Sequence, residues 1–317
     1  MAILIDVGTR IAVQTAFEGY ESRSILKMPV YASNTVAHVT SRGTGYAGAD
    51  HWFLNSLPIF ASMGEAVARA KANAALIYAA PALAAGAVLA AIDAGVPLVV
   101  LIAEDVPAEG RALIRAALAD TDTVLVGPGA PELVTPDGCQ IGATPSYIFA
   151  RGRIGILSES GALAREAALQ TSALGLGQSS VISLNRTPLS EGAFIHCLKQ
   201  FLDDGETDSI VLLTDGNGQI ETAVAALLAA EGHSKPIVAH IGAPPAATEA
   251  SAVAALRDVG VTIVESPARI GVAVNTALDG RDSERRVRLA ASDFVTVMRQ
   301  VEQEIYGAPQ EPVRQSA

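Results

Sequence analysis

The sequence has few cysteines, few aromatic residues and little positive charge. Its two cysteines, Cys139 and Cys197, are too few for a disulfide framework, so we expect a reduced, cytoplasmic setting. The formal net charge of −11 at pH 7 argues against nucleic acid as a partner, because nucleic-acid-binding proteins present a basic face. No apolar run approaches the ~20 residues that span a bilayer, and no signal peptide opens the chain. We therefore expect a soluble protein that binds no membrane.

Metal ligands are also scarce. The five histidines form no pair at the spacing typical of a metal site. His196 and Cys197 are adjacent, so in a helix their side chains would lie on different faces. We therefore expect no metal ion bound by this chain itself.

The chain instead alternates short apolar runs with Ala-rich amphipathic stretches. Half of its residues are hydrophobic but only 4% are aromatic, a composition that suits closely packed helices and buried parallel strands. Helical patterns separate the apolar runs, which predicts parallel βαβ units with both faces of each sheet covered. The fold class is therefore α/β, with two parallel sheets in series. The expected strands cover residues 10–16, 34–40, 74–80, 97–103, 123–128, 153–159, 179–185, 209–215, 236–242 and 261–266.

This pattern divides the chain into four segments. Residues 1–127 are expected to form a first α/β domain, and residues 152–280 a second one. Between them, residues 128–151 are rich in Pro and Gly and have no clear periodicity, so we interpret them as a linker. The pattern changes again at residues 281–317, which are predicted to be a terminal helix followed by a polar tail.

The stretch "GRIGILSESGALARE", residues 152–166, holds the strongest candidate site. An apolar strand pattern ends at Ser158, and an Ala-rich helical pattern follows it. The turn between them lacks the two glycines that flank the serine of a nucleophile elbow. Two interpretations remain open. The backbone amides of Ser160, Gly161 and Ala162 could hold an anion at the start of the helix, or Ser160 could serve only as the N-cap.

Two other residues lie at predicted strand ends, where ligands bind in open α/β sheets. His240 is near the end of the stretch "PIVAHIG", and Asp215 follows "SIVLLT" before a Gly-rich turn. A lone strand-end histidine is more often structural than catalytic, and an aspartate in such a place commonly initiates a turn. The local sequence alone therefore gives neither residue a function.

The order of these turns resembles the alpha subunit of succinyl-CoA synthetase, a member of the NDP-forming acyl-CoA synthetase family. The similarity runs from residue 1 to about residue 280 and is carried by "AILIDVGTRIAVQ", "VGPGAPELVTPDGCQIGATP", "GRIGILSESGALAREA" and "SPARIGVAV". It implies a Rossmann-like CoA-binding domain followed by a flavodoxin-like ligase domain. It also implies an ATP-grasp beta-type partner, through which alone ATP or GTP and magnesium would act.

In that family a phosphohistidine on a mobile loop carries the phosphoryl group, and the turn matching Ser160-Gly161 receives it. The resemblance places Asp215 where the family has the glutamate that steadies the phosphohistidine. Family members carry a long loop containing Gly-His-Ala-Gly after the strand matching "KPIVAHIG", whereas this chain runs "HIGAPPAATEASAVAAL" directly into a helix. The phosphohistidine is therefore absent, and His240 is expected inside the strand.

The resemblance also places a CoA site in the first domain, in altered form. Glu18 and Glu21 stand where family glycines let backbone amides approach a phosphate, and carboxylates at these positions would repel an anion. We therefore expect weak binding of CoA. The residues expected at this altered site are Gly19, Thr40, Arg42, Gly43, Pro81 and Glu104.

Three functions fit these observations. The first is an alpha-type subunit of an acid–CoA ligase whose phosphohistidine step is lost or rerouted, with an acyl, carbamoyl or phosphoryl group transferred at Ser160-Gly161. Its substrate would be a small carboxylic acid or a carbamoyl compound. The second is a functional acid–CoA ligase subunit that uses another phosphoryl relay. The third is a non-catalytic scaffolding or regulatory subunit.

Overall fold

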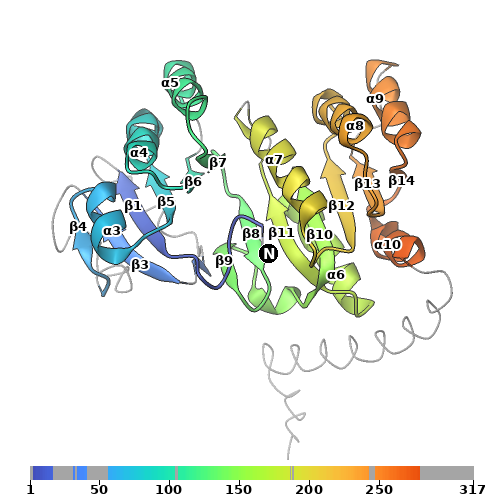
Figure 1. Cartoon of the computed structure of the whole chain (residues 1–317), viewed down its shortest axis with the longest axis horizontal. Coiled ribbons are helices and arrows are strands. Elements are labelled where there is room, and N and C mark those ends of the chain that lie inside the picture. The colour runs from blue at the N-terminus through green and yellow to red at the C-terminus, as the bar shows by residue number, and fades with distance from the viewer. Residues whose placement is uncertain are drawn as a thin grey trace, which may run out of the picture.

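A computed structural model describes residues 3–16, 31–32, 34–40, 56–103, 106–185, 187, 189–242 and 247–278. Within them the chain forms two twisted sheets side by side, each packed with helices (Figure 1). The predicted α/β class is confirmed, since both sheets are built mainly of parallel strands alternating with helices.

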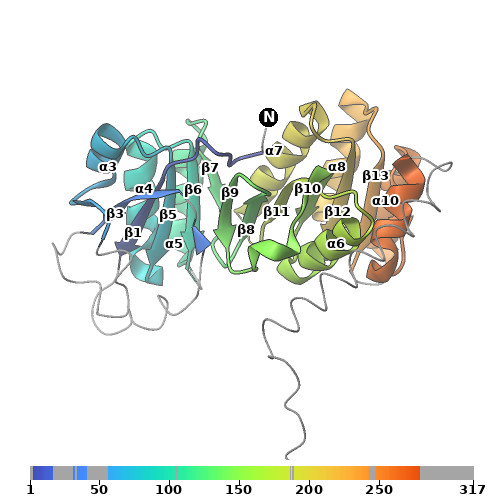
Figure 2. The ribbon, with the colours of Figure 1, turned by 90° about the horizontal axis from the view of Figure 1, so that it is seen from below.

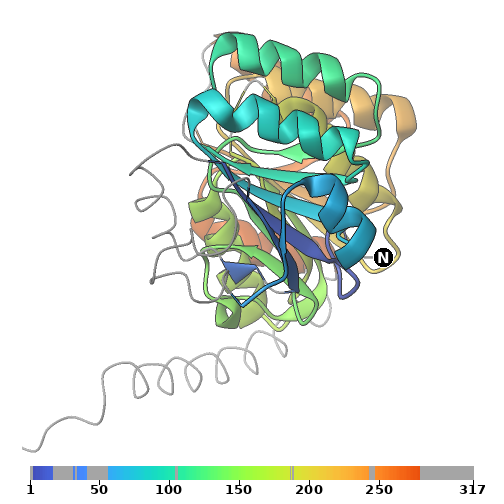
Figure 3. The ribbon, with the colours of Figure 1, turned by 90° about the vertical axis from the view of Figure 1, so that its left-hand side faces the viewer.

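The first sheet is entirely parallel. Its strands are β1 (Ile11–Ala16), β3 (Thr35–Val39), β4 (Ile59–Phe60), β5 (Ala74–Ala79), β6 (Leu98–Ile102) and β7 (Val124–Val126). They lie in the order β4-β3-β1-β5-β6-β7. The helices α3 (Met63–Ala70), α4 (Pro81–Asp93) and α5 (Ala108–Leu118) share a buried cluster with one face of this sheet. Figure 3 looks at the molecule from this end, with α4 and α5 lying across the sheet.

The other face of the first sheet packs toward the second one. Val13, Leu76 and Val100 point to that side and belong to the same buried cluster as Leu157 and Leu212 of the second sheet. Because a continuous apolar core joins the two sheets, separating them would expose a large hydrophobic surface to water.

The second sheet is mixed. Its strands are β2 (Tyr31–Ala32), β8 (Glu132–Thr135), β9 (Cys139–Gly142), β10 (Arg151–Ser158), β11 (Gln178–Ser183), β12 (Ser209–Thr214), β13 (Ile237–Ile241) and β14 (Thr262–Val264). They lie in the order β14-β13-β12-β10-β11-β8-β9-β2. The strands from β14 to β11 are parallel, whereas β8, β9 and β2 extend the sheet in antiparallel pairs.

Helices cover both faces of this second sheet. The helices α7 (Ser190–Asp203), α8 (Gln219–Glu231) and α9 (Ala247–Asp258) lie on one side. On the other side lie α6 (Gly161–Ala173) and α10 (Ile270–Leu278), as Figures 1 and 2 show. Side chains on β10 alternate accordingly: Ile154 and Ile156 pack toward α6, and Leu157 packs toward α7.

The residues expected to form a linker contain two strands. The segment 128–151 includes β8 and β9, and β8 pairs with β11 through Val134 and Val181. Strands of four residues interrupted by a Pro-Asp-Gly turn are too short for a period-2 pattern to stand out, which is why they looked aperiodic. The boundaries that we assigned to the domains stay predictions, and residues 281–317 lie outside the described residues.

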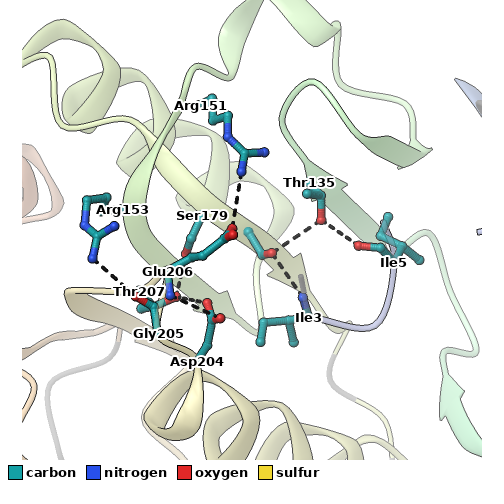
Figure 4. A network of polar contacts seen from close by, with 11 residues as sticks. Ile3, Ile5, Thr135, Arg151, Arg153, Ser179, Asp204, Gly205, Glu206 and Thr207 are labelled. Atoms are coloured by element: carbon teal, nitrogen blue, oxygen red, sulfur yellow. Dashed lines mark hydrogen bonds and ion pairs between the residues drawn. The ribbon is translucent and has the colours of Figure 1, made fainter. Parts of the chain in front are cut away.

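Polar contacts tie the N-terminal segment to the second sheet (Figure 4). The amide of Ile3 donates to Ser180 Oγ at 3.3 Å, and Thr135 Oγ1 donates to the carbonyl of Ile5 at 2.7 Å. Both isoleucines are buried in the shared core. The chain therefore contacts β8 and β11 before it enters the first sheet at β1.

A second polar network lies at the amino ends of β10, β11 and β12, and Figure 4 shows most of it. Ser179 Oγ lies 2.7 Å from Thr207 Oγ1, and Thr207 Oγ1 donates to Asp204 Oδ2 at 2.7 Å. Arg153 pairs with Asp208, and the hydrogen bond from this guanidinium lowers the pKa of the Asp208 carboxyl. This edge is opposite to the one where the strands β10 and β12 end.

Candidate functional site

The predicted anion site lies at the carboxyl end of the second sheet. There β10 ends at Ser158 and leads through a two-residue turn into α6, while β12 ends at Thr214 and leads through a Gly-rich turn into α8. Since β10 and β12 are parallel neighbours, both helices begin at the same edge. This is where an open α/β sheet offers helix N-termini to a ligand.

Ser160 is the N-cap of α6. Its Oγ accepts a hydrogen bond from Leu163 N at 3.4 Å. The Ser160 amide is also engaged, because it donates to Ser158 Oγ at 2.9 Å. The amides of Gly161 and Ala162, however, have no acceptor among the described residues. The N-cap interpretation is thus confirmed, and two of the three predicted amides have no partner among the described residues.

Glu159 is turned away from these amides. Its side chain is buried, and its Oε2 accepts a hydrogen bond from Asp215 N at 3.0 Å. Its own amide donates to the carbonyl of Leu213 at 2.8 Å. Both contacts direct Glu159 toward β12, so its carboxylate does not cap Gly161 or Ala162. This contact also places Glu159 beside Asp215, the acidic residue that the sequence placed at a strand end.

His240 lies inside β13, as the sequence predicted. It is 6% exposed, and its Nδ1 lies 3.0 Å from the carbonyl of Val264 on the neighbouring strand. The strand ends at Ile241 and α9 begins at Ala247, so five residues separate the two elements. The side chain of His240 is therefore fixed in the sheet and is not carried by a long loop.

Only part of the predicted CoA site lies within the described residues. Thr40 is buried directly after β3, and Pro81 is the first residue of α4, directly after β5. Both stand at the carboxyl edge of the first sheet, on the strands that flank β1. The N-cap of α4, Ala80, offers no side-chain cap, but Pro81 has no N–H and Leu83 N donates to Ala80 O at 2.9 Å, which leaves the amide of Ala82 without an acceptor among the described residues. The predicted residues Gly19, Arg42, Gly43 and Glu104 lie outside the described residues.

Sequence reasoning missed a buried carboxylate at the same edge as α6. Glu221, in the first turn of α8, is 1% exposed, and neither of its side-chain oxygens has a hydrogen-bond partner. In the sequence alone, Glu221 looks like one of the acidic residues that commonly begin a helix. Its burial could have been predicted from its spacing, because Glu221 falls on the same helical face as the buried Ala225 and Leu228.

We expect Glu221→Met to raise the free energy of unfolding by about 1–3 kcal/mol, because it removes an unpaired buried polar group while keeping the side-chain length. Denaturant unfolding followed by circular dichroism measures the change. Glu231→Met is the matched control: Glu231 ends the same helix, its side chain is 47% exposed, and it pairs with Lys199 at 2.9 Å. That variant should stay within about 0.5 kcal/mol of the parent. A loss of stability in Glu221→Met would contradict the argument.

The described residues show no group of three metal-ligating side chains that could hold an ion. They do form a cavity of about 680 Å³ at the outer edge of the second sheet, lined by residues of β14 and α10, among them Val272, and by Arg269, which directly precedes α10. None of the predicted site residues lines this cavity. It is therefore separate from the α6 site.

Family models match both halves of the chain. The model described as a CoA binding domain matches residues 18–105, and that of a succinyl-CoA ligase like flavodoxin domain matches residues 151–276. The alpha subunit of ADP-forming succinate–CoA ligase from Aquifex aeolicus is 32% identical over 314 residues, covering 92% of this chain and 100% of the relative. The chain belongs to the succinate–CoA ligase alpha-subunit family. Alpha subunit 1 from Archaeoglobus fulgidus is 31% identical over 285 residues, covering 84% of this chain and 94% of that relative.

Solved structures of larger enzymes share the fold. ATP citrate lyase from Methanothrix soehngenii, in complex with citrate and coenzyme A, matches with a TM-score of 0.65 and 17% identity, covering 99% of this chain and 57% of that chain. A dinucleotide-forming acetyl-coenzyme A synthetase from Ca. Korarchaeum cryptofilum, in complex with phosphate and ADP, matches with a TM-score of 0.61 and 17% identity. That match covers 86% of this chain and 61% of the synthetase chain. This family member therefore spans under two thirds of either enzyme chain.

One structural observation bears on the expectation that the chain does not span a membrane. Among the helices of the described residues, none has both the length and the apolar character needed to cross a bilayer.

Proposed function

We propose that this chain is the alpha-type subunit of an acid–CoA ligase-like enzyme that acts in the cytoplasm with an ATP-grasp beta-type partner. The group to be transferred, from a small carboxylic acid or a carbamoyl compound, lies at the N-terminus of α6. The observation that carries this proposal is the pair of unoccupied amides at Gly161 and Ala162, left open because Glu159 is bonded to Asp215 instead. The alpha-subunit relatives support the assignment to a two-subunit ligase.

In the simplest form of this function, the partner uses ATP or GTP with magnesium to make an acyl phosphate. The thiol of CoA then attacks the acyl carbon, so that a carbon–sulfur bond forms and the bond from carbon to the phosphate oxygen breaks. Phosphate leaves, and the thiol proton passes to water. Amides at the start of α6 would hold the acyl oxygen during this step, where the helix dipole stabilises developing negative charge. The family's phosphohistidine relay is lost or rerouted.

The experiment is co-expression with ATP-grasp proteins encoded near this gene, followed by co-purification and assay. A stable complex that consumes ATP in the presence of CoA and small carboxylic or carbamoyl acids supports the proposal. A complex without turnover would favour a scaffolding or regulatory subunit. Failure of every such partner to bind the chain would overturn the proposed two-subunit function.

A further inference from the structure

The last residue of β11, Ser183, carries a buried hydroxyl group with no partner. Its residue is 0% exposed, and Ser183 Oγ makes no hydrogen bond. Buried hydroxyl groups nearly always make a hydrogen bond, since a buried hydroxyl group without one costs free energy. An alanine at this position would fill the space without that cost. The hydroxyl is therefore a feature that folding alone does not explain.

Ser183 lies directly beneath the N-terminus of α6. It is the register partner of Ser158 across β10 and β11, so both side chains point to the same face of the sheet. Val181, two residues earlier, packs toward α6, which identifies that face. A Cβ atom built on Gly161 would lie 3.8 Å from Ser183 Oγ, with no nearer neighbour. Because Gly161 has no side chain, nothing stands between the hydroxyl and the first turn of α6.

The charges beside this turn favour some ligands over others. Glu159 immediately precedes Ser160, and its Oε2 accepts a hydrogen bond from Asp215 N, so its carboxylate, although turned toward β12, stays close to the turn that begins α6, and a second acidic residue follows at the same edge of the sheet. The repulsion that acidic side chains exert on a bound anion grows in proportion to the charge of that anion. A phosphate dianion is repelled about twice as strongly as a carboxylate monoanion at the same distance.

We propose that Ser183 is a substrate-binding residue, and that the α6 site takes the carboxylate of a small acid in preference to a phosphoryl group. Ser183 Oγ donates to one carboxylate oxygen, and the amides of Gly161 and Ala162 donate to the same group from the other side. This inference rests on the proposed function only in placing the substrate at the start of α6.

Comparing Ser183→Ala with the same substitution at a second buried serine, Ser209, separates an effect on ligand binding from an effect on folding. Ser209 is also 0% exposed on a strand, but its Oγ donates to the carbonyl of Pro236 at 2.9 Å, at the opposite edge of the sheet. The probes are acetate and inorganic phosphate at pH 8, titrated against the full chain while the NMR shifts of the Gly161 and Ala162 amides are followed. Ser183→Ala should weaken acetate binding ~3–10-fold, the value of one hydrogen bond, while its melting temperature stays level or rises. Ser209→Ala should lower the melting temperature and leave acetate binding unchanged.

Three other results of this titration would each contradict a different part of the proposal. If Ser183→Ala and the parent chain bind acetate equally well, Ser183 is not a binding residue, although the proposed function stands. If the parent chain binds phosphate more tightly than acetate, the substrate class is wrong. If neither probe moves the two amides in the parent chain, the α6 N-terminus is not a site, and the proposed function loses its main support. Ser183→Gly serves as the second variant, because it also removes the hydroxyl without adding bulk.

Discussion

Incubation of this chain with ATP and a family beta subunit should leave all five histidines without a phosphoryl group. A phosphohistidine that shuttles between two sites needs a ring nitrogen that is free and a backbone that can move. His240 meets neither condition, since it is buried in β13 with Nδ1 bonded to Val264 O, and five residues separate this strand from α9. The measurement is radiolabelling from ATP, quenched in base because phosphohistidine is stable there and labile in acid.

Of the other described histidines, His233 and His38 are likewise held by hydrogen bonds. His233 has both ring nitrogens against backbone carbonyls, with Nδ1 2.9 Å from Lys235 O and Nε2 2.8 Å from Val259 O. His38 is buried in β3 with Nε2 3.0 Å from Thr15 Oγ1. His196 is exposed, but it lies within the helix α7 and is therefore not carried by a mobile loop. The control is an alpha subunit of the family that retains the Gly-His-Ala-Gly loop, which should label under the same conditions. Stoichiometric labelling of any histidine of this chain would contradict the prediction.

Replacing Glu18 and Glu21 together should strengthen CoA binding by up to about three decades. At an effective dielectric constant of about 20, a carboxylate ~4 Å from a unit negative charge costs about 4 kcal/mol, which is about three decades in Kd. Salt screening and retreat of the side chains reduce this value. Thr40 and the N-terminus of α4 lie at the carboxyl edge of the first sheet, where ligands bind in open α/β sheets. Calorimetry on the parent chain should show CoA binding much weaker than micromolar.

Two sets of variants separate charge from bulk. Glu18→Gln with Glu21→Gln removes only the charge, whereas Glu18→Gly with Glu21→Gly also opens the backbone to the phosphate. Glu109→Gln with Glu231→Gln, on the exposed sides of α5 and α8, changes the net charge equally and should leave CoA binding nearly unchanged. Low-micromolar affinity of the parent chain for CoA, or no gain in either double variant of Glu18 and Glu21, would show that the two glutamates do not oppose the ligand.

The sequence by itself determined most of the alternation of strands with helices, and the family. Apolar runs such as "SIVLLT" and "PLVVLIA" became the fully buried strands β12 and β6, because buried parallel strands need continuous apolar residues. It also placed the turn at Ser160 and kept His240 within a strand. These features depend on residues that are close in the sequence, so local patterns were enough to find them.

Only the tertiary structure decided which polar groups have partners. Glu159 leaves the α6 amides open because it meets Asp215, a residue 56 positions away along the chain. Ser183 lies beneath Gly161 because β11 pairs beside β10, and Glu221 is buried because of how α8 packs on the core. Likewise, β8 and β9 became visible only through the antiparallel pairing of β8 with β11 and of β9 with β8. Hydrogen bonding and burial depend on what the fold brings together across the sheet, and no pattern of neighbouring residues contains that information.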